Sequence, residues 1–294
     1  MNNPSRFERN LGFLSSAEQD VIESSSVAIA GAGGDGGMLA VQLARMGVGE
    51  LRLADPDPFE IENINRQAVC TDGTIGTNKA VAVGDYLKQI NPNISVKLFT
   101  DGITEANTAE FIRGVDLVID ETEFTMQSLA VMLGREARNQ GIPNLTALNI
   151  GFGAVVTTYC PDGPTIEKRL GFKEDQSLEE IDEAEVKVDR WLPYLPKYGD
   201  LKVLEKVASG EKSAPSIAPG VAIAAAAGST QAILNLLKGG DNHRPEPVYA
   251  PKALVFDVMT GEAKKIKYSR GSHYRHLARM VVANTLHRNP QTSY

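Results

Sequence analysis

The chain has 294 residues, a formal net charge of −7 at pH 7, 42% hydrophobic residues and two cysteines. A chain of this length can bury a core large enough for one big domain or two packed ones, so it needs no disulfide framework. The acidic balance argues against general binding to polyanions, and the absence of any Cys-x-x-Cys pair excludes a zinc ribbon. We expect neither a secretory leader nor a membrane-length apolar run, which favours a reducing, cytoplasmic setting.

The N-terminal part of the chain contains a strand, a glycine-rich loop and a helix in immediate succession. Ser26–Ala30 is a short apolar run typical of a buried parallel strand, and the glycines of segment 31–37 follow it directly. A helical apolar period ends at Gly47, and Glu50–Ala54 then alternates as a second strand. This order predicts a βαβ unit.

Further helices and strands continue the alternation to about residue 148. They are expected as helices at 78–89, 104–113 and 125–140 and as strands at 95–99, 115–120 and 144–148. Strands that alternate with helices usually form a parallel sheet covered on both faces. The predicted fold class is therefore α/β, a doubly wound, mostly parallel, Rossmann-like sheet with helices on both faces.

The pattern changes after residue 151. Segment 153–159 alternates like an antiparallel edge strand, and turn residues and a polar stretch follow it. A core helix is expected at 217–237 and two more strands at 253–259 and 263–268. These strands predict an antiparallel C-terminal extension of the sheet.

This pattern divides one compact unit into four parts. The acidic block at 174–185 is interpreted as a solvated face, with an amphipathic helical lid that uses Leu178 and Ile181 as the alternative. The basic helix expected at 274–286 is interpreted first as a docking helix and second as a contact for an anion or RNA. The four parts of the unit are a core with an N-terminal helical arm (1–160), an insert over one face (161–215), a late helix with antiparallel strands (216–270) and the basic C-terminal helix (271–294).

The glycine loop is the first candidate site. Gly31, Gly33, Gly34 and Gly36 lie between a buried strand and a helix start, where backbone N–H groups and the helix dipole can face a phosphate. A tight turn without a ligand is the alternative, but the strand-loop-helix context favours nucleotide binding. Asp35 is unusual here, because a carboxylate would repel phosphate unless it points away or changes what is bound.

A polar cluster follows the second strand. Asp55 ends that strand, where an acidic side chain can accept hydrogen bonds from a ribose diol, which by itself favours NAD. A dinucleotide has no need for the donors that follow, whereas a triphosphate needs cationic and amide donors and a carboxylate for its metal. An isolated Arg66 or Lys79 would be a solvated surface charge, but the joint pattern favours a triphosphate site. The cluster consists of Asp57, Asn63, Asn65, Arg66 and Gln67, and Lys79 adds a further charge.

The motifs together resemble one family. Gly-x-Gly-Gly-x-Gly, Asp-x-Asp, Asn-x-Asn-Arg-Gln and Gly-x-x-Lys resemble the ThiF, MoeB and HesA adenylyltransferases, relatives of the ubiquitin-activating enzymes. The similarity runs from Arg6 to about Leu148 and resumes over 216–268.

The resemblance implies roles for these residues. Asp55 would hold the ATP ribose, the glycine loop would approach the nucleotide through its backbone, and Asn63, Arg66 and Lys79 would bind the triphosphate and stabilise charge as pyrophosphate leaves. Arg9 would enter the neighbouring subunit's site, which implies a homodimer. On composition alone Arg9 is an ordinary surface arginine.

The candidate metal ligands depart from the family pattern. The family usually has Asp-x-Thr-Asp-Asn after the fourth strand, whereas this chain has Asp120, Glu121, Thr122, Glu123 and Phe124. Glu123 would replace the magnesium-binding aspartate, with the metal shared with Asp57 or Asp120, because a carboxylate one methylene longer still suits a hard cation. The alternative is that these glutamates are loop charges.

The cysteine content is the second departure from the family pattern. Many relatives carry a cysteine ahead of the late helix and two Cys-x-x-Cys zinc pairs, and this chain has neither. The resemblance therefore implies no thioester step and no zinc. Cys70 and Cys160 are interpreted as small packed residues.

The predicted function is an ATP- and magnesium-dependent adenylyltransferase that activates a carboxylate as an acyl-adenylate and releases pyrophosphate. The carboxylate would belong to a ubiquitin-like carrier protein, a peptide or a small molecule, with a tRNA nucleoside not excluded. An NAD-dependent oxidoreductase and an inactive nucleotide-binding scaffold are the rival hypotheses.

Overall fold

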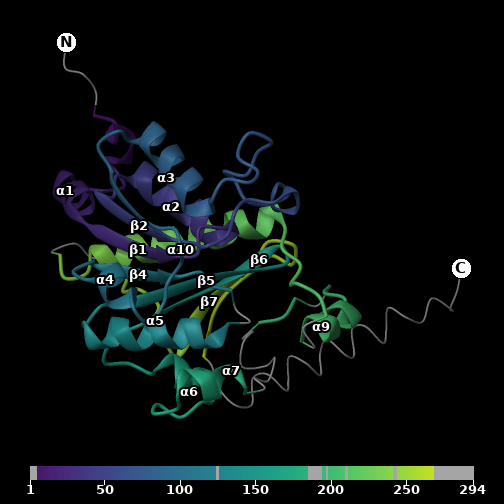
Figure 1. Cartoon of the computed structure of the whole chain (residues 1–294). Coiled ribbons are helices and arrows are strands. Elements are labelled where there is room, and N and C mark those ends of the chain that lie inside the picture. The colour runs from purple at the N-terminus through teal and green to yellow at the C-terminus, as the bar shows by residue number, and fades with distance from the viewer. Residues whose placement is uncertain are drawn as a thin grey trace, which may run out of the picture.

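A computed structural model describes residues 5–123, 126–184, 194–196, 198–208, 211–240 and 244–267. The fold is built on one eight-stranded sheet with the strand order β3-β2-β1-β4-β5-β6-β7-β8 (Figure 1). The strands are β1 (Ser26–Ala30), β2 (Glu50–Ala54), β3 (Ser95–Phe99), β4 (Leu117–Asp120), β5 (Asn144–Ile150), β6 (Gly153–Tyr159), β7 (Lys252–Asp257) and β8 (Glu262–Lys267).

The first five strands form the parallel half of this sheet. β1 pairs in parallel with both β2 and β4, β2 pairs with β3, and β4 pairs with β5. The strand order therefore reverses between β1 and β4, which is the doubly wound arrangement that places ligands at the carboxyl ends of the central strands. The predicted Rossmann-like fold class is confirmed.

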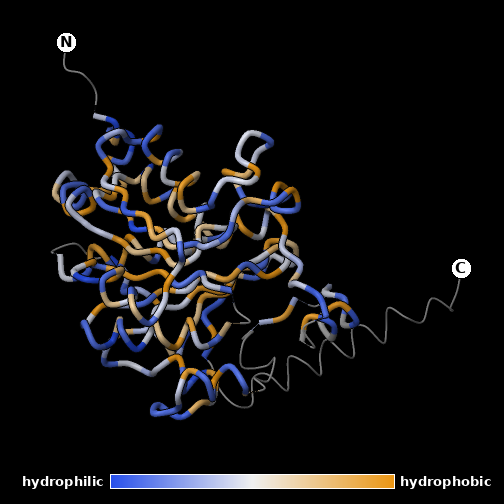
Figure 2. The backbone as a smooth tube through the Cα atoms, in the orientation of Figure 1, coloured by the Kyte–Doolittle hydropathy of each residue, from blue (hydrophilic) through white to orange (hydrophobic). Residues whose placement is uncertain are grey.

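Helices cover both faces of the sheet. α2 (Gly34–Met46), α3 (Lys79–Ile90) and α10 (Ala218–Leu236) lie on one face with α1 (Ser16–Ser24), and α4 (Thr108–Ile112) and α5 (Gln127–Asn139) lie on the other (Figure 1). β4 shows the division, because Leu117 and Ile119 pack into the cluster beneath α2, α3 and α10 while Val118 packs beneath α4 and α5. Figure 2 shows that apolar residues (orange) are frequent along the central strands and hydrophilic residues (blue) on the outer loops.

The antiparallel extension is confirmed, but β6 is not an edge strand. β6 pairs with β5 on one side and β7 on the other, and all seven of its residues are buried. The prediction of an edge strand was wrong because the alternation in 153–159 does not reveal that β7 and β8, about ninety residues later, pair outside it.

The insert contains short helices that pack on the α5 face. α6 (Ile166–Leu170) and α7 (Leu178–Asp182) bury Ile166, Leu170 and Ile181 in a cluster with Val131 of α5 and Tyr159 of β6. α7 falls in the acidic block that was interpreted as solvated, so one side of that block is packed. Further along, α9 (Leu201–Ala208) precedes α10.

Two features complete the description. The basic helix expected at 274–286 lies outside the described residues. Among the helices that the structure describes, none is both long enough and apolar enough to cross a membrane.

Candidate active site

The glycine loop joins β1 to α2 in a backbone path that side chains could not follow. Gly31 has φ +94°, and a Cβ there would lie 2.2 Å from the carbonyl oxygen of Glu121. A Cβ on Gly36 would lie 1.9 Å from the carbonyl oxygen of Gly31. Because only glycine tolerates these contacts, the chain turns tightly into the first turn of α2 and presents helix N-terminal N–H groups, the arrangement that binds phosphate.

Asp55 connects this loop to the segment after β2. Its Oδ2 accepts a hydrogen bond from the N–H of Ala32 at 2.7 Å, and its Oδ1 accepts one from the N–H of Asp57 at 3.0 Å. Burial raises the pKa of Asp55, while these hydrogen bonds and the charge of Lys79 lower it. The carboxyl group is thus fixed beside the glycine loop, and each oxygen keeps a lone pair for a ribose hydroxyl.

Arg66 and Gln67 lie against the same loop. The position of a Cβ on Gly34 is 4.0 Å from Cγ of Arg66, and that of a Cβ on Gly33 is 3.5 Å from the amide of Gln67. The Nη1 of Arg66 donates to the carbonyl of Glu62 at 3.2 Å. The structure therefore brings the predicted arginine to the glycine cradle.

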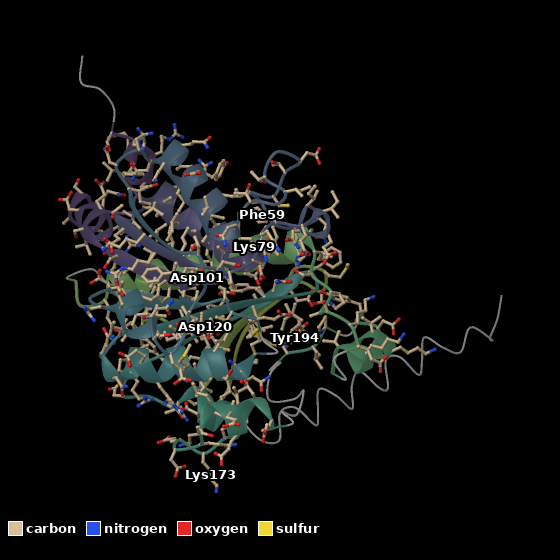
Figure 3. The ribbon with its side chains drawn as sticks, viewed as in Figure 1. Phe59, Lys79, Asp101, Asp120, Lys173 and Tyr194 are labelled. Atoms are coloured by element: carbon tan, nitrogen blue, oxygen red, sulfur yellow. The ribbon has the colours of Figure 1, made fainter. Side chains whose placement is uncertain are left out.

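Lys79 reaches the site from the first residue of α3. Its Nζ lies 2.9 Å from Oδ2 of Asp57, and the lysine side chain is only 12% exposed while that of Asp57 is 64% exposed. Figure 3 shows Lys79 beside Phe59 on the α3 side, away from Asp120 in the sheet layer. Asn63 is used locally, since its Oδ1 accepts from the N–H of Glu60 at 3.1 Å.

Asp35 and Glu121 are two partly buried acids near the glycine loop whose environment sequence reasoning did not predict. Oδ2 of Asp35 accepts from the N–H of Asn149 at 3.1 Å and from its Nδ2 at 2.6 Å. Burial raises the pKa of Asp35 to about 7, against the opposing effect of the Asn149 hydrogen bonds and of Arg66. Burial and the neighbouring charge of Asp35 raise the pKa of Glu121. Asp35 therefore turns to the end of β5 and not into the phosphate cradle.

The two candidate metal ligands, Asp120 and Glu123, lie in different environments. Oδ1 of Asp120 accepts from the N–H and Oγ1 of Thr122, and its side chain lines a small cavity of about 70 Å³ with Tyr159 and Arg169 on the α5 face. Glu123 is exposed. Nowhere in the described part of the chain do three or more His, Cys, Asp or Glu residues gather as a metal-binding group.

Arg9 lies at the far end of α2 from the glycine loop. It belongs to a short 3₁₀ helix, Glu8–Asn10, and Nδ2 of Asn10 donates to the carbonyl of Met46 at 3.4 Å. The 13 residues of α2 separate Arg9 from the loop by about 20 Å. Arg9 therefore cannot serve the site of its own chain.

Both cysteines are free thiols. Cys70 is buried, and burial raises the pKa of both the Cys70 and the Cys160 thiol. Raised pKa values disfavour the thiolate that a nucleophile requires.

Known proteins share this architecture. E. coli MccB in complex with ATP superimposes with a TM-score of 0.67 at 22% identity, over 92% of this chain and 72% of that one. The SAMP-activating enzyme E1 of Haloferax volcanii is 36% identical over 142 residues, which are 48% of this chain and 52% of the enzyme. The tRNA threonylcarbamoyladenosine dehydratase of Haemophilus influenzae is 38% identical over 100 residues, which are 34% of this chain and 38% of that protein.

This chain thus spans about half, or less, of the length of these curated relatives. The model of the ThiF family matches residues 7–275, nearly the whole chain. The resemblance inferred from the sequence motifs is confirmed, and the chain belongs to the ThiF family.

Proposed function

We propose that this protein is an ATP-dependent adenylyltransferase that activates a carboxylate as an acyl-adenylate. The observation that carries the proposal is the convergence of a glycine cradle, a ribose-type acid and two cations at the carboxyl ends of β1 and β2. A dinucleotide site would use the glycines and Asp55 but would leave Arg66 and Lys79 without a ligand. A triphosphate uses all four features.

The residues would act by positioning and by stabilising charge. A carboxylate oxygen of the substrate forms a bond to the α-phosphorus of ATP, the bond from that phosphorus to the bridging oxygen breaks, and the electron pair leaves on pyrophosphate. Arg66 and Lys79 would hold the leaving phosphates, where their charge stabilises the transition state more than the ground state. The loop N–H groups and Asp55 would fix the nucleotide at its other end.

Magnesium would neutralise part of the triphosphate charge when bound. Of the acidic residues near the cradle, Asp57 and Glu123 are exposed, whereas Asp120 is buried and held by Thr122. Mg²⁺ commonly binds through one or two carboxylates plus substrate phosphates, so Asp57 and Glu123 fit as its protein ligands.

The relatives and the two cysteines indicate the class of substrate and acceptor. The curated relatives include a SAMP-activating enzyme E1 and a tRNA threonylcarbamoyladenosine dehydratase. Because the two thiols are buried or disfavoured as nucleophiles, we propose that the acyl group passes to an external acceptor without a cysteine thioester. The carboxylate would be the C-terminus of a carrier protein or a peptide, and the enzyme would act as a homodimer with Arg9 of each subunit in the other's site.

Exchange of labelled pyrophosphate into ATP tests the proposal. We expect exchange that depends on a carboxylate substrate chosen from carrier-protein tails, peptides and modified tRNA. Arg66→Ala is expected to lower the exchange rate about a hundredfold or more. If ATP binds but no candidate supports exchange, the proposed chemistry is wrong.

A further inference from the structure

A chain of hydrogen bonds runs from the first turn of α2 to Arg66 through three residues that are distant in sequence. Asn149 donates its N–H and its Nδ2 to the same oxygen of Asp35. Oδ1 of Asn149 accepts from Oγ of Ser216 at 3.0 Å. Asp35 thereby fixes the orientation of the Asn149 amide, since Nδ2 must face the carboxylate and Oδ1 must face the serine.

The chain continues from Ser216 to the arginine. The carbonyl of Ser216 accepts from Nδ2 of Asn65 at 3.0 Å, and Oδ1 of Asn65 accepts from Nη1 of Arg66 at 2.9 Å. Asn65 is exposed, so packing alone does not fix its rotamer. The two hydrogen bonds therefore fix where the Asn65 amide lies, and Asn65 then shares Nη1 of Arg66 with the carbonyl of Glu62, which accepts from it at 3.2 Å.

Close packing keeps Ser216 in place. Ser216 lies two residues before the start of α10, and a Cβ on Gly220 in the first turn of that helix would lie 2.3 Å from the carbonyl of Gly151. Val221, the next residue, lies 3.3 Å from the Cβ position of Gly34 in the glycine loop. The start of α10 is thus packed between the β5–β6 turn and the nucleotide cradle, and Ser216 has little freedom to move relative to either.

We propose that Asp35 and Asn149 are positioning residues that, through Ser216 and Asn65, hold the Arg66 guanidinium toward the phosphates. The segment that enters α10 is then part of the catalytic apparatus and not only a connection from the insert. The proposal rests on the function proposed above, since it assigns to Arg66 a role in the transfer step. It also explains why an acid is tolerated in the glycine loop: its carboxylate is committed to Asn149.

A double-mutant cycle measures this connection in pyrophosphate exchange. Asn149→Leu removes both ends of the amide, and we expect kcat to fall about tenfold or more while KM for ATP changes much less, because a displaced arginine loses transition-state contacts first. In an Arg66→Ala background the same substitution should cause no further loss. Asn235→Leu is the matched control, since Asn235 is a half-buried asparagine of α10 that bonds Thr158 and Gln231.

Two further variants separate positioning from folding. Asn65→Ala alters an exposed residue, so it should preserve the melting temperature and still lower kcat. Asp35→Asn keeps an oxygen for Asn149 and should retain most activity, whereas Asp35→Leu should lose it. Losses from Asn149→Leu and Arg66→Ala that multiply, or full activity in Asn65→Ala, would overturn the proposal. Wild-type protein without exchange would instead refute the proposed function.

Discussion

At the residue scale, Lys79 offers a direct measure of what a single cation contributes. It pairs with Asp57, whose exposed carboxylate can return to water when the ammonium is removed. We expect Lys79→Met to leave the melting temperature nearly unchanged and to lower kcat in pyrophosphate exchange about a hundredfold. Lys97→Met is the matched control, because Lys97 makes the same type of ion pair with Glu50 at the β2–β3 edge. Equal effects from the two variants would contradict a role for Lys79 in the site.

Asp35 gives a pH-dependent prediction. Its pKa in the fold is about 7 against 3.8 in the unfolded chain, so the folded state binds the proton more tightly. The resulting stability is complete below pH 3.8 and is lost as the pH rises through about 7. Asp35→Asn cannot ionise and keeps an acceptor for Asn149. We expect its melting temperature to exceed that of the wild type by roughly several degrees at alkaline pH and by much less under acidic conditions.

Thermal melts across this pH range check that expectation. Asp116→Asn is a suitable control, because Asp116 is an exposed acid that accepts hydrogen bonds from Ser26. A difference between wild type and Asp35→Asn that stays constant with pH would show that the carboxyl group does not carry the proton in the fold.

The sequence gathers the glycine loop, Asp55, Asn65, Arg66 and Lys79 into one candidate site, but it does not connect Asn65 with Ser216 and Asn149. The glycines, Asp55, Arg66 and Lys79 are contiguous with one βαβ unit, so local motifs reveal them. Asn65 and Ser216 are 151 positions apart, and Asn149 and Ser216 are 67 apart. No local spacing connects such residues, and only the packing of α10 against β5 brings them together. Asp35 was expected to point away from phosphate, but its partner could not be named.

At the scale of elements, the sequence predicted the ends of several strands and helices closely. β2 and β3 match the expected ranges, and β7 and α10 differ from them by two residues or fewer. α4 begins at Thr108, four residues later than expected, because Thr104–Asn107 forms a turn closed by the side chain of Asn107. α6 was missed, since a helix of five residues is specified by its contacts with α5 more than by its own period. α9 was missed although its eight residues have a clear amphipathic period.

An ion pair between α5 and α6 allows a test of how these two helices stabilise each other. Nε of Arg135 lies 2.8 Å from Oε1 of Glu167, whose side chain is 5% exposed, and Nη2 of Arg135 donates to the carbonyls of Glu174 and Gln176. Arg135→Met leaves the Glu167 carboxylate buried without its cation. We expect a loss of about 2–3 kcal/mol, somewhat below that for a fully buried pair because the arginine is partly exposed.

Chemical denaturation measures that loss. In the double variant Arg135→Met with Glu167→Gln, no charge remains buried, so part of the stability should return. Pyrophosphate exchange should change little in either variant, because the ion pair joins α5 to α6 whereas the cradle lies between β1 and α2. A double variant no more stable than Arg135→Met would contradict this account.

At the scale of the whole molecule, the two halves of the sheet contact different parts of the chain. Its parallel half, β3 to β5, ends at the glycine cradle, whereas its antiparallel half contacts the insert through Tyr159 of β6 and Asp257 of β7. α10 contacts both halves, since it packs against α2 and also crosses β5 and β6. We therefore expect a displacement of the insert to reach the cradle through the start of α10. This requires that the insert be fastened to the antiparallel half.

Tyr194 provides that fastening. Its hydroxyl donates to Oδ2 of Asp257 at the end of β7 at 2.7 Å, and Asp257 is 1% exposed. Burial and the hydrogen bond to Asp257 raise the pKa of Tyr194, so the hydroxyl remains a donor well above neutral pH. Tyr194→Phe removes one donor from a buried carboxylate, which typically costs about 1.5–3 kcal/mol. We expect limited proteolysis to cleave the insert of this variant faster than that of the wild type.

The release of the insert should also lower pyrophosphate exchange, because Ser216 and the start of α10 lose a support. Tyr86→Phe serves as the control, since Tyr86 lies in α3 and packs against the opposite face of the sheet. If Tyr194→Phe accelerates cleavage but leaves exchange intact, the insert is fastened for stability alone. If both change while Tyr86→Phe changes neither, the fastening of the insert to β7 sets the geometry of the cradle.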